Sequence, residues 1–403
     1  MSEIKQGYKQ TEIGMIPKDW DCCTIEELIK DISMGPFGSN ITVSNFISEG
    51  IPVLNGYNVS EKCLKDNFSN YVTPQKAQSL KKAIAKRGDV VVTHRGTIGQ
   101  ISFIPLNSKF DSYVISQSQF RVTFDKLKVL PDFVVLYFHS EKGQSTIHES
   151  KGHTGVPAIA QPTTTFRKFV IPLPILSEQT AIATALSDID ALITSLDKKI
   201  TKKQYIKQGA MQQLLTGKKR LPGFSGEWVE KKLGDVCDFK RGQMITSSQF
   251  SVGSIPVIAG GKTPAGFHNI SNRESNTITI SGSGANAGFV AFHSFPIFAS
   301  DCSTINEADN YNIKYIYYLL VSKQLEIYIA QTGGAQPHIH PKDIEPLVFN
   351  MPINKIEQTA IAQILTDMDY EITQLEAERN KYQQIKAGMM QQLLTGKIRL
   401  IKK

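Results

Sequence analysis

Apolar residues recur at heptad spacing in two long stretches of the chain, and these stretches are copies of each other. Residues 178–221 and 357–400 align without a gap and agree at 27 of 44 positions. Spacings of four and three residues separate the apolar positions, which is typical of helices that pack against each other. The pattern therefore predicts two long helices that pair through these side chains. The expected contact residues are Ile182, Leu186, Ile189, Ile193, Leu196 and Ile200 in the first copy, and Ile361, Leu365, Met368, Ile372 and Leu375 in the second.

The ends and the interior of both copies carry further helix signals. Asn354 and Glu357 are three residues apart at the start of the second copy, a spacing that predicts a capping box. About 38 helical residues in each copy correspond to a rod roughly 55 Å long. Each copy contains a glycine, Gly209 or Gly388, which indicates a close helix contact or a local bend. The helices could simply fill a hydrophobic core, but their length favours antiparallel pairing as a spacer.

The blocks outside the helices consist of shorter elements of mixed type. In the first block, residues 116–124 alternate polar with apolar side chains, which predicts a half-buried strand. The β-branched residues 89–93 predict another strand. Residues 72–86 and 131–148 have the composition and spacing of helices.

The second block repeats the order of the first with different residues. Residues 277–288 parallel residues 89–99, and residues 334–339 parallel residues 155–159. We therefore expect an α+β fold with two similar domains, separated by two long repeated helices that pair as an antiparallel coiled coil. The order of segments is cyclic, which suits a pseudo-two-fold architecture within one chain. The expected segments are residues 1–176 (domain 1), 177–217 (helix 1), 218–355 (domain 2) and 356–403 (helix 2 and tail).

Composition narrows the possible compartments. The 403 residues include no apolar run near the ~20 residues of a membrane span, and the first residues show no signal-peptide pattern. The five cysteines have no CxxC spacing. This argues against a disulfide framework and against a zinc site, and it predicts a cytoplasmic location.

Charge is compatible with a polyanionic partner but is unevenly distributed. The net charge is +8 and the pI is about 9.0. Residues 1–177 and 178–221 each carry +4, whereas residues 222–356 carry −1 and residues 357–403 carry +1. If both domains bind DNA, domain 2 must therefore depend on individually placed residues and backbone amides more than on bulk charge.

No catalytic site, metal or cofactor is predicted in this chain. Residues 260–263 resemble the end of a phosphate-binding loop, but Pro256 occupies the position of its first glycine. His338 and His340 have the spacing of paired metal ligands, but no third ligand is evident, which favours polar loop residues. Paired aspartates recur on the helices and fit a solvated or partner-docking face better than acid–base chemistry. They are Asp188, Asp190, Asp367 and Asp369.

Several motifs occur together in an order that resembles one family. Each helix begins after a proline with Glu-Gln, at residues 178–179 and 357–358, and ends with Leu-Leu-Thr-Gly-Lys. Domain 2 opens with Pro-Gly-Phe-Ser-Gly-Glu-Trp, and domain 1 contains Gly-Pro-Phe-Gly-Ser at residues 35–39 and Arg-Gly-Thr-Ile-Gly at residues 95–99. Over essentially its whole length the chain resembles the specificity subunit of type I restriction–modification systems. Domain 2 departs from domain 1 at residues 281–288, as expected if each domain reads a different sequence.

The resemblance implies a DNA-binding subunit with no chemistry of its own. Each domain would read one half of a bipartite, asymmetric site in double-stranded DNA, while the helices would set the spacer and dock two methyltransferase subunits. Those subunits methylate adenine N6 with S-adenosylmethionine, and restriction/translocase subunits that use ATP and Mg complete the family's complex. Two domains on a rigid spacer independently suit two major-groove sites roughly 34–36 Å apart. The alternatives are a coiled-coil scaffold protein that does not bind DNA and a self-contained nuclease or methyltransferase.

Readout of base edges needs polar side chains on loops or strands that reach a groove. Sequence alone does not separate residues that read bases from residues that contact the backbone. The candidates in domain 1 are Lys81, Lys82, Lys86 and Arg87 for phosphates, together with His94, Arg95, Thr97, Gln117, Gln119, Arg121, Lys151, His153 and Thr154. The candidates in domain 2 are Lys262, Ser281, Ser283, Asn286, His338, His340 and Lys342.

Overall fold

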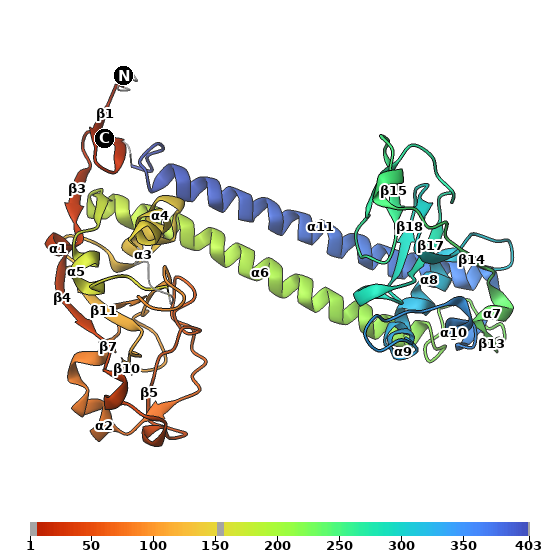
Figure 1. The fold of residues 1–403 in the computed structure, drawn as a ribbon, viewed down its shortest axis with the longest axis horizontal. Coiled ribbons are helices and arrows are strands. Elements are labelled where there is room, and N and C mark those ends of the chain that lie inside the picture. The colour runs from red at the N-terminus through yellow and green to blue at the C-terminus, as the bar shows by residue number, and fades with distance from the viewer. Residues whose placement is uncertain (1–5, 151–156, 402–403) are drawn as a thin grey trace. The chain divides into compact units, whose positions relative to one another are not determined.

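The structure is a computed structural model that describes residues 6–150 and 157–401. It divides into two compact units: unit 1 comprises Met1–Ser195 and Arg379–Lys403, and unit 2 comprises Leu196–Glu378. Each unit contains one of the two variable blocks and parts of two long helices, α6 (Leu176–Leu214) and α11 (Lys355–Leu393) (Figure 1). The compact units therefore cut through both helices, whereas the segments expected from the sequence end at helix boundaries.

Both long helices begin and end within a few residues of the expected positions. At the start of α11, the side-chain oxygen of Asn354 accepts a backbone N–H of the first turn at 2.9 Å. The predicted capping box is wrong, because the carboxylate of Glu357 turns away to Arg220. Beyond the helix ends, Gly217 and Gly396 have φ angles of 71° and 68°, a left-handed conformation that favours glycine and stops a helix.

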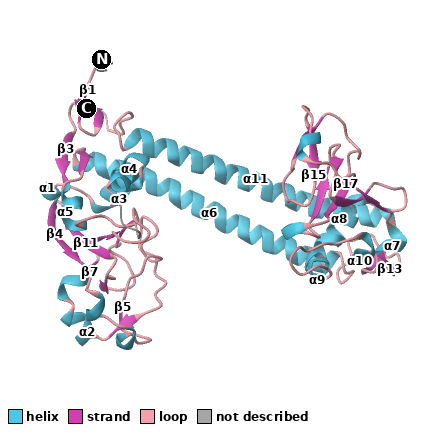
Figure 2. Cartoon of the chain, viewed as in Figure 1, coloured by secondary structure: helices cyan, strands magenta, loops and turns pink. Residues whose placement is uncertain are grey.

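Unit 1 contains a four-stranded antiparallel sheet in the order β4-β11-β8-β9. Strand β11 alternates buried and half-buried residues, as the polar–apolar pattern predicts for a sheet with one covered face. Figure 2 shows the helices and strands of this unit. Helix α3 packs against the sheet, and its Phe133 and Phe138 are fully buried. The strands are β1 (Tyr8–Thr11), β2 (Gly14–Pro17), β3 (Asp21–Thr24), β4 (Ile29–Met34), β5 (Ile51–Pro52), β6 (Tyr71–Val72), β7 (Ile84–Lys86), β8 (Val90–Thr93), β9 (Ile101–Phe103), β10 (Ser112–Val114), β11 (Gln119–Phe124) and β12 (Val170–Leu173).

The shorter helices of unit 1 differ from two sequence-based expectations. The predicted helix over residues 72–86 is wrong in its second half, because the chain turns at Leu80 and then pairs as a strand with β10. The predicted helix over residues 131–148 is two helices, because Ser140 is extended and caps the second one by accepting Gly143 N–H at 3.2 Å. The helices are α1 (Ile25–Leu28), α2 (Pro74–Ser79), α3 (Pro131–His139), α4 (Glu141–Glu149) and α5 (Pro162–Arg167), with single 3-10 turns η1 (Gly38–Asn40), η2 (Val43–Asn45) and η3 (Lys81–Ala83).

Unit 2 repeats the central sheet of unit 1 with its own strands, in the order β14-β20-β17-β18. Helix α8 covers this sheet and buries Tyr315, Ile316 and Leu320. The strands are β13 (Trp228–Lys232), β14 (Phe239–Arg241), β15 (Ile255–Ile258), β16 (Gly266–His268), β17 (Thr277–Ser281), β18 (Val290–His293), β19 (Phe298–Ala299), β20 (Cys302–Ile305) and β21 (Val348–Pro352). The helices are α7 (Leu233–Val236), α8 (Ile313–Ser322), α9 (Gln324–Ile329) and α10 (Pro341–Ile344), with 3-10 turns η4 (Ser247–Gln249) and η5 (Gly284–Asn286).

The ends of the long helices complete the core of each unit. In unit 1, Ile182 and Leu186 of α6 share a core with Leu393 of α11 and with the adjoining Leu394. In unit 2, the core contains Met211 and Leu214 of α6 together with the start of α11. Of the eleven apolar positions expected at the helix contact, nine are buried, and the other two, Ile193 and Met368, are half-buried.

Ion pairs join the two helices at matched positions inside each unit. Lys386 Nζ lies 2.6 Å from the carboxylate of Asp190 in unit 1, and Lys207 Nζ lies 2.5 Å from that of Asp369 in unit 2. A Cβ atom added at Gly209 or Gly388 would meet no atom of the described residues within 4 Å beyond its own turn of helix, so these glycines do not mark a close helix contact within this part of the chain. Among the described residues, no helix is long and apolar enough to cross a bilayer.

Candidate nucleic-acid interface

Three backbone segments of unit 1 form a single surface at the end of β8. His94 N–H donates to the Ser118 carbonyl, and the His94 carbonyl accepts Ile159 N–H, both at 2.9 Å. Gly96 N–H donates to the Pro157 carbonyl at 2.9 Å. We call this surface interface 1 and define it as residues 94–97, 116–118 and 157–159. It is the place where the strands of the central sheet give way to loops.

Two predicted readers lie inside unit 1 and shape this surface from within. His94 is 9% exposed, its Nε2 lies 3.3 Å from the Gln117 carbonyl, and burial lowers the pKa of its imidazole. Gln119 is fully buried, with its side-chain oxygen accepting Ser116 N–H at 3.0 Å and its amide donating to the Asn55 carbonyl at 3.1 Å. Gln119 was a candidate for reading base edges, but it is buried and its polar atoms are used internally.

Three other predicted readers are exposed on interface 1. Arg95 forms a backbone bridge with Ala158 and leaves its guanidinium in solvent. Thr97 is exposed, and its hydroxyl donates to the Gln100 side chain at 2.7 Å. Gln117 is also exposed. Guanidinium, hydroxyl and carboxamide groups are those that recognise base edges, so the surface has the chemistry that direct readout requires.

The predicted phosphate contacts of unit 1 divide into anchored and exposed groups. Arg87 donates to the carbonyls of Ser108 and Phe110 and pairs with Asp111 at 2.8 Å, so it orders the loop before β10. Arg121 is similarly engaged, with an ion pair to Asp31 at 2.7 Å. In contrast, three lysines on η3 and at the end of β7 are exposed and have the character of phosphate ligands. They are Lys81, Lys82 and Lys86. The predicted residues Lys151, His153 and Thr154 lie outside the described residues.

Unit 2 repeats the hydrogen-bond frame of interface 1 with different side chains. Ile339 N–H donates to the Gly282 carbonyl at 3.0 Å, and Gly284 N–H donates to the Pro337 carbonyl at 2.9 Å. Ser283 forms a backbone bridge with His338, at the position that Arg95 occupies in unit 1. We call this surface interface 2 and define it as residues 282–284, 299–301 and 337–340.

Two residues that the sequence patterns missed contact the side chains of interface 2: Asp301 belongs to it, and Arg241 adjoins it. The Ser283 hydroxyl donates to the carboxylate of Asp301, which follows the turn before β20. Arg241, at the end of β14, brings its guanidinium to 3.4 Å from Nδ1 of His340. His338 and His340 have nearly parallel rings with centroids 6.4 Å apart. Asp301 is the counterpart of Ser118, because Gly282 N–H donates to the Asp301 carbonyl as His94 N–H donates to the Ser118 carbonyl. A residue-by-residue alignment of the two domains could therefore have pointed to Asp301.

The remaining predicted residues of unit 2 differ in accessibility. Ser281 is 3% exposed and is therefore part of the core of the turn. Lys262 is exposed, with its Nζ 5.4 Å from the centre of the Phe289 ring. Asn286 on η5 is half-buried, and Lys342 on α10 is exposed. Lys262 and Lys342 can therefore reach solvent or a phosphate, whereas Ser281 cannot.

The acidic residues and histidines of the described chain can be compared with what a metal site requires. Within the described ranges, no group of three or more His, Cys, Asp or Glu residues could hold a metal ion. Asp190 and Asp369 are engaged in the ion pairs between the helices, and Asp367 accepts the Gln363 amide at 2.7 Å. These aspartates therefore hold the helices together or lie on their surface.

A comparison with protein families identifies the family of this chain. The family model described as the type I restriction modification DNA specificity domain matches residues 17–207 and residues 225–387 of the sequence. The chain belongs to this family. The two matches correspond to the two variable blocks and the helical segments that follow them, so the molecule contains two DNA specificity domains. Its function is DNA sequence recognition in a type I restriction–modification system, and the scaffold alternative is not favoured.

Relatives of this specificity-domain protein span its whole length. The MjaX specificity subunit from Methanocaldococcus jannaschii is 26% identical over 98% of this chain and 97% of its own. The MjaVIII specificity subunit from the same organism is 24% identical with the same coverage. A crystal structure of a type I S subunit from M. genitalium shares the fold, with a TM-score of 0.65, 18% identity and coverage of 93% and 96% of the two chains.

Both specificity domains carry the same buried constellation where one long helix begins and the other ends. We call it the Trp–Glu–Arg clasp: Trp20, Glu178 and Arg399 in unit 1, and Trp228, Glu357 and Arg220 in unit 2. Arg399 binds Glu178 in a bidentate manner at 2.5 and 2.7 Å, and Trp20 Nε1 donates to the same carboxylate at 2.9 Å. Arg220 binds Glu357 at 2.6 and 2.7 Å, and Trp228 Nε1 donates at 3.3 Å.

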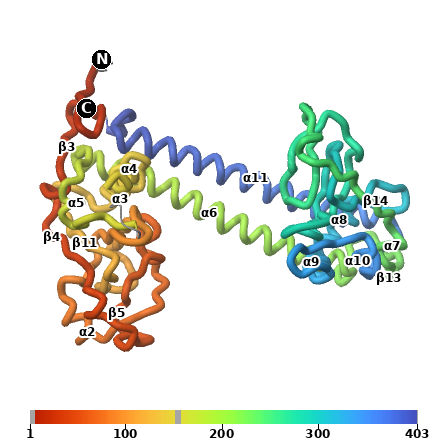
Figure 3. The backbone as a smooth tube through the Cα atoms, in the orientation of Figure 1, coloured from red at the N-terminus to blue at the C-terminus, as the bar shows by residue number. Residues whose placement is uncertain are grey.

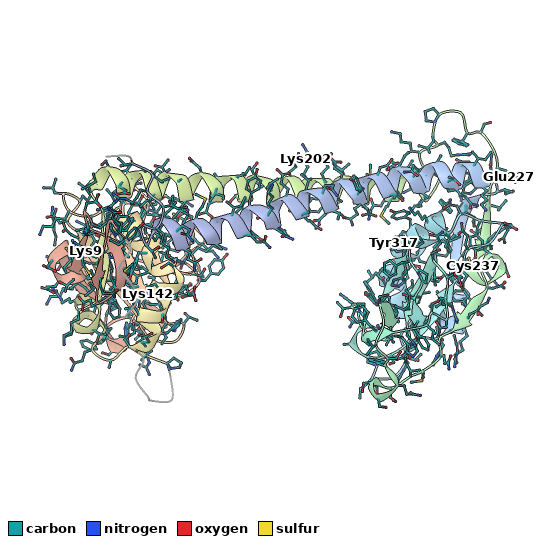
Figure 4. The ribbon with its side chains drawn as sticks, turned by 90° about the horizontal axis from the view of Figure 1, so that it is seen from above. Lys9, Lys142, Lys202, Glu227, Cys237 and Tyr317 are labelled. Atoms are coloured by element: carbon teal, nitrogen blue, oxygen red, sulfur yellow. The ribbon has the colours of Figure 1, made fainter. Side chains whose placement is uncertain are left out.

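The clasp of unit 1 joins the two terminal segments of the chain. The two terminal segments lie close together (Figure 3). Arg399 also binds Asp19 at 2.8 and 3.0 Å, and the Tyr8 hydroxyl donates to the Gly396 carbonyl at 3.0 Å. The hydrogen bonds to both carboxylates raise the pKa of the Arg399 guanidinium. In unit 2 the residue matching Asp19 is Glu227, which is exposed (Figure 4). The two clasps therefore share their central residues and differ at their rim.

Proposed function

We propose that this specificity-domain protein recognises a bipartite, asymmetric DNA sequence, with each domain reading one half. The observation that supports this most directly is the shared frame of the two interfaces. The backbone hydrogen bonds that present Arg95 in unit 1 present Ser283 in unit 2, and the facing residue changes from Ala158 to His338. Equal frames with unequal donors and acceptors suit two half-sites of different sequence.

The side chains suggest how each half-site is read. Arg95 has the guanidinium that binds guanine O6 and N7 in a bidentate manner, while Gln117 suits adenine. In unit 2, Asp301 can accept from cytosine N4, and Ser283 lies beside it. The exposed lysines at residues 81, 82 and 86 would contact phosphates and fix the register of unit 1 on the duplex.

We further propose that α6 and α11 pair as an antiparallel coiled coil, related by a pseudo-two-fold axis, which sets the spacer between the half-sites. The buried seam residues and the matched ion pairs of Asp190 and Asp369 support this pairing. The exposed surroundings of Gly209 and Gly388 are equivalent in the two copies and would accept two methyltransferase subunits. Restriction/translocase subunits would join the same complex.

In this proposal the chain itself is non-catalytic. The partner subunits would bind S-adenosylmethionine, ATP and Mg, and this chain would supply only recognition of the DNA sequence. Adenine N6 methylation then depends on this chain for its position and on the partners for its chemistry. This division predicts that the purified chain, given Mg or a methyl donor alone, leaves DNA unmodified.

Co-expression with the methyltransferase partner tests the proposal. Single-molecule sequencing should map methylated adenines to one split, asymmetric motif that disappears when this chain is omitted. A palindromic motif would contradict unequal readout by the two domains, and a motif without a central gap would contradict the spacer.

Arg95→Ala tests the assignment of one interface to one half-site. We expect methylation to tolerate substitutions in one half of the motif only, with a loss of about 1–3 kcal/mol of discrimination at the base pair that Arg95 contacts. Lys126→Ala, a change at an exposed lysine in the turn after β11, is the matched control and should leave the motif unchanged. Equal weakening on all DNA sequences would reassign Arg95 to a phosphate.

A further inference from the structure

Two equivalent loops each project a large apolar side chain into solvent. In unit 1 the loop after β4 exposes Phe37, which is 81% exposed. In unit 2 the loop after β14 exposes Met244, which is 78% exposed. Single apolar side chains on a surface are ordinary. The match between two domains whose polar residues have diverged is what requires an explanation.

The two loops leave the central sheet in the same way. Gly35 N–H donates to the Gln119 carbonyl, and Gly242 N–H donates to the Cys302 carbonyl, both at 2.8 Å. A side chain at Gly35 would come within 1.9 Å of the Ser116 carbonyl oxygen, and one at Gly242 within 2.0 Å of the Ser300 carbonyl oxygen. Phe37 and Met244 each follow this obligatory glycine by two residues, so they hold equivalent positions.

The two loops are also anchored alike at their far ends. Thr42 N–H donates to the Asn45 side chain at 3.0 Å, and Thr246 N–H donates to the Gln249 side chain at 2.8 Å. Each threonine begins a 3-10 turn closed by a capping box. The unit 1 loop is three residues longer between the glycine and the threonine. Both loops are therefore fixed at two points, and an apolar tip lies between them.

Both tips lie beside the interfaces that we assign to DNA. In unit 1 a side chain at Gly38 would approach the Gln117 carboxamide oxygen to 2.6 Å, and Phe37 lines one groove with Lys81 and Lys82. In unit 2, Ile245 N–H donates to the Ser300 hydroxyl at 3.2 Å, one residue before Asp301. The neighbouring groups are suited to bind phosphates and base edges. We therefore expect the apolar side chain of each loop to contact the same DNA duplex.

We propose that Phe37 and Met244 are apolar wedges that insert between stacked bases, one in each half-site. Phe and Met are among the side chains that unstack a base step and bend the duplex. The two domains keep apolar bulk here while the polar residues of their interfaces differ, which suits a residue that deforms DNA without reading its sequence. The proposal rests on DNA recognition by this chain and adds a mechanical contribution to it.

The test uses the full chain in complex with its methyltransferase partner and duplexes that contain the mapped site. 2-Aminopurine replaces one base at a time, at positions other than the methylated adenine, because base extrusion by a methyltransferase also raises its fluorescence. With the unaltered chain, we expect fluorescence to rise at one step in each half-site. Dyes at the duplex ends should report a bend by energy transfer.

Phe37→Ala should abolish the fluorescence rise in the half-site read by unit 1 and leave the other half-site unchanged. We expect binding to weaken 5- to 50-fold while the methylated motif stays the same. Met244→Ala should show the mirror result, and Phe37→Leu should retain most of the signal because it keeps an apolar wedge. Leu127→Ala is the matched control: it removes an 82% exposed side chain in the turn at the opposite end of β11.

Five results separate this inference from its alternatives. A normal fluorescence rise with Phe37→Ala would overturn the wedge. A changed base preference at one position would instead make Phe37 a reader of a thymine methyl group. Loss of the methyltransferase from the complex would make the loop a protein contact. Failure of the unaltered chain to prefer its mapped site over unrelated DNA would refute the proposed function itself, whereas preference without any fluorescence rise would refute the wedge alone.

Discussion

Removal of the clasp arginine in unit 1 should destabilise that unit strongly. Glu178 is 1% exposed, and Arg399 provides its bidentate counter-charge. Arg399→Met keeps much of the aliphatic volume but leaves a buried carboxylate that, among the described residues, keeps a hydrogen bond from Trp20 alone. Breaking a buried ion pair by removing one partner typically costs about 3–5 kcal/mol. Because the side chain of Arg399 is 28% exposed, we expect a loss near the lower limit, about 3 kcal/mol.

The chain offers an unusually direct assay for this loss. Its two tryptophans are Trp20 and Trp228, and each lies in the clasp of a different unit. In a Trp228→Phe background, urea denaturation followed by fluorescence reports unit 1 alone. At an m-value of about 2 kcal/mol per M, a loss of ~3 kcal/mol lowers the midpoint by ~1.5 M. Arg220→Met in a Trp20→Phe background is the matched experiment on unit 2.

A double variant tests whether the pair, and not the arginine alone, carries the effect. Arg399→Met combined with Glu178→Gln removes the orphaned charge, so the double variant should recover at least 1 kcal/mol relative to Arg399→Met. If the losses of the two single variants instead add, the two side chains act independently and the clasp is not a coupled unit.

Two further predictions concern unit 2. Leu365→Asp places a charge at a fully buried position of the helix contact and should lower the free energy of unfolding by more than ~3 kcal/mol. Size-exclusion chromatography should show loss of the partner subunits, whereas the control Gln363→Asp, at an exposed position of the same helix, should retain them. Intact assembly of Leu365→Asp would reject the pairing model. Burial lowers the pKa of His293 to about 4, so the unfolded chain binds a proton between about pH 6.5 and 4 that the folded chain does not. Stability should therefore fall by up to roughly 3 kcal/mol as the pH decreases through this range, and His293→Asn should lack that component in urea titrations followed at Trp228.

The sequence pattern predicted the parts of the fold that depend on local periodicity. The heptad spacing located both long helices, and alternation located β11, because each pattern reflects one covered face of a regular element. The predicted helix over residues 72–86 failed because Ile84 and Ala85 pair with a strand almost thirty residues away. Helical composition could not outweigh a long-range strand contact that buries Ala85 completely.

The candidate site was predictable in its location and less so in its individual residues. Arg95 and Ser283 were found because the repeat aligns the two glycine-rich turns. Gln119 was misassigned because a polar residue type suggested exposure to solvent. Its side-chain amide instead donates to the carbonyl of Asn55, a residue distant in sequence. The exposure of Phe37 was not predicted, because an aromatic residue in a sequence normally indicates core.

The clasps were also missed, although a signal was present in the repeat. Glu178 and Arg399 are 221 residues apart, and only the folded chain brings them together. Both repeats, however, begin with a glutamate and have an arginine as their penultimate residue. Opposite charges retained at the two ends of both copies are the pattern expected if each glutamate pairs with the arginine of the other copy.

The division of the chain between the units has a consequence for its synthesis. Unit 2 is one continuous stretch, whereas unit 1 lacks part of its core until Arg379–Lys403 is made. On a ribosome, Ile182 and Leu186 emerge about 200 residues before Leu393, one of the residues that share their core. At a translation rate of ~5–20 residues per second, roughly 10–40 s pass before the C-terminal part of α11 is available to pack against those apolar side chains. The N-terminal recognition domain is therefore translated first and completed last, and it is the part of the molecule most exposed to nascent-chain chaperones and to premature termination.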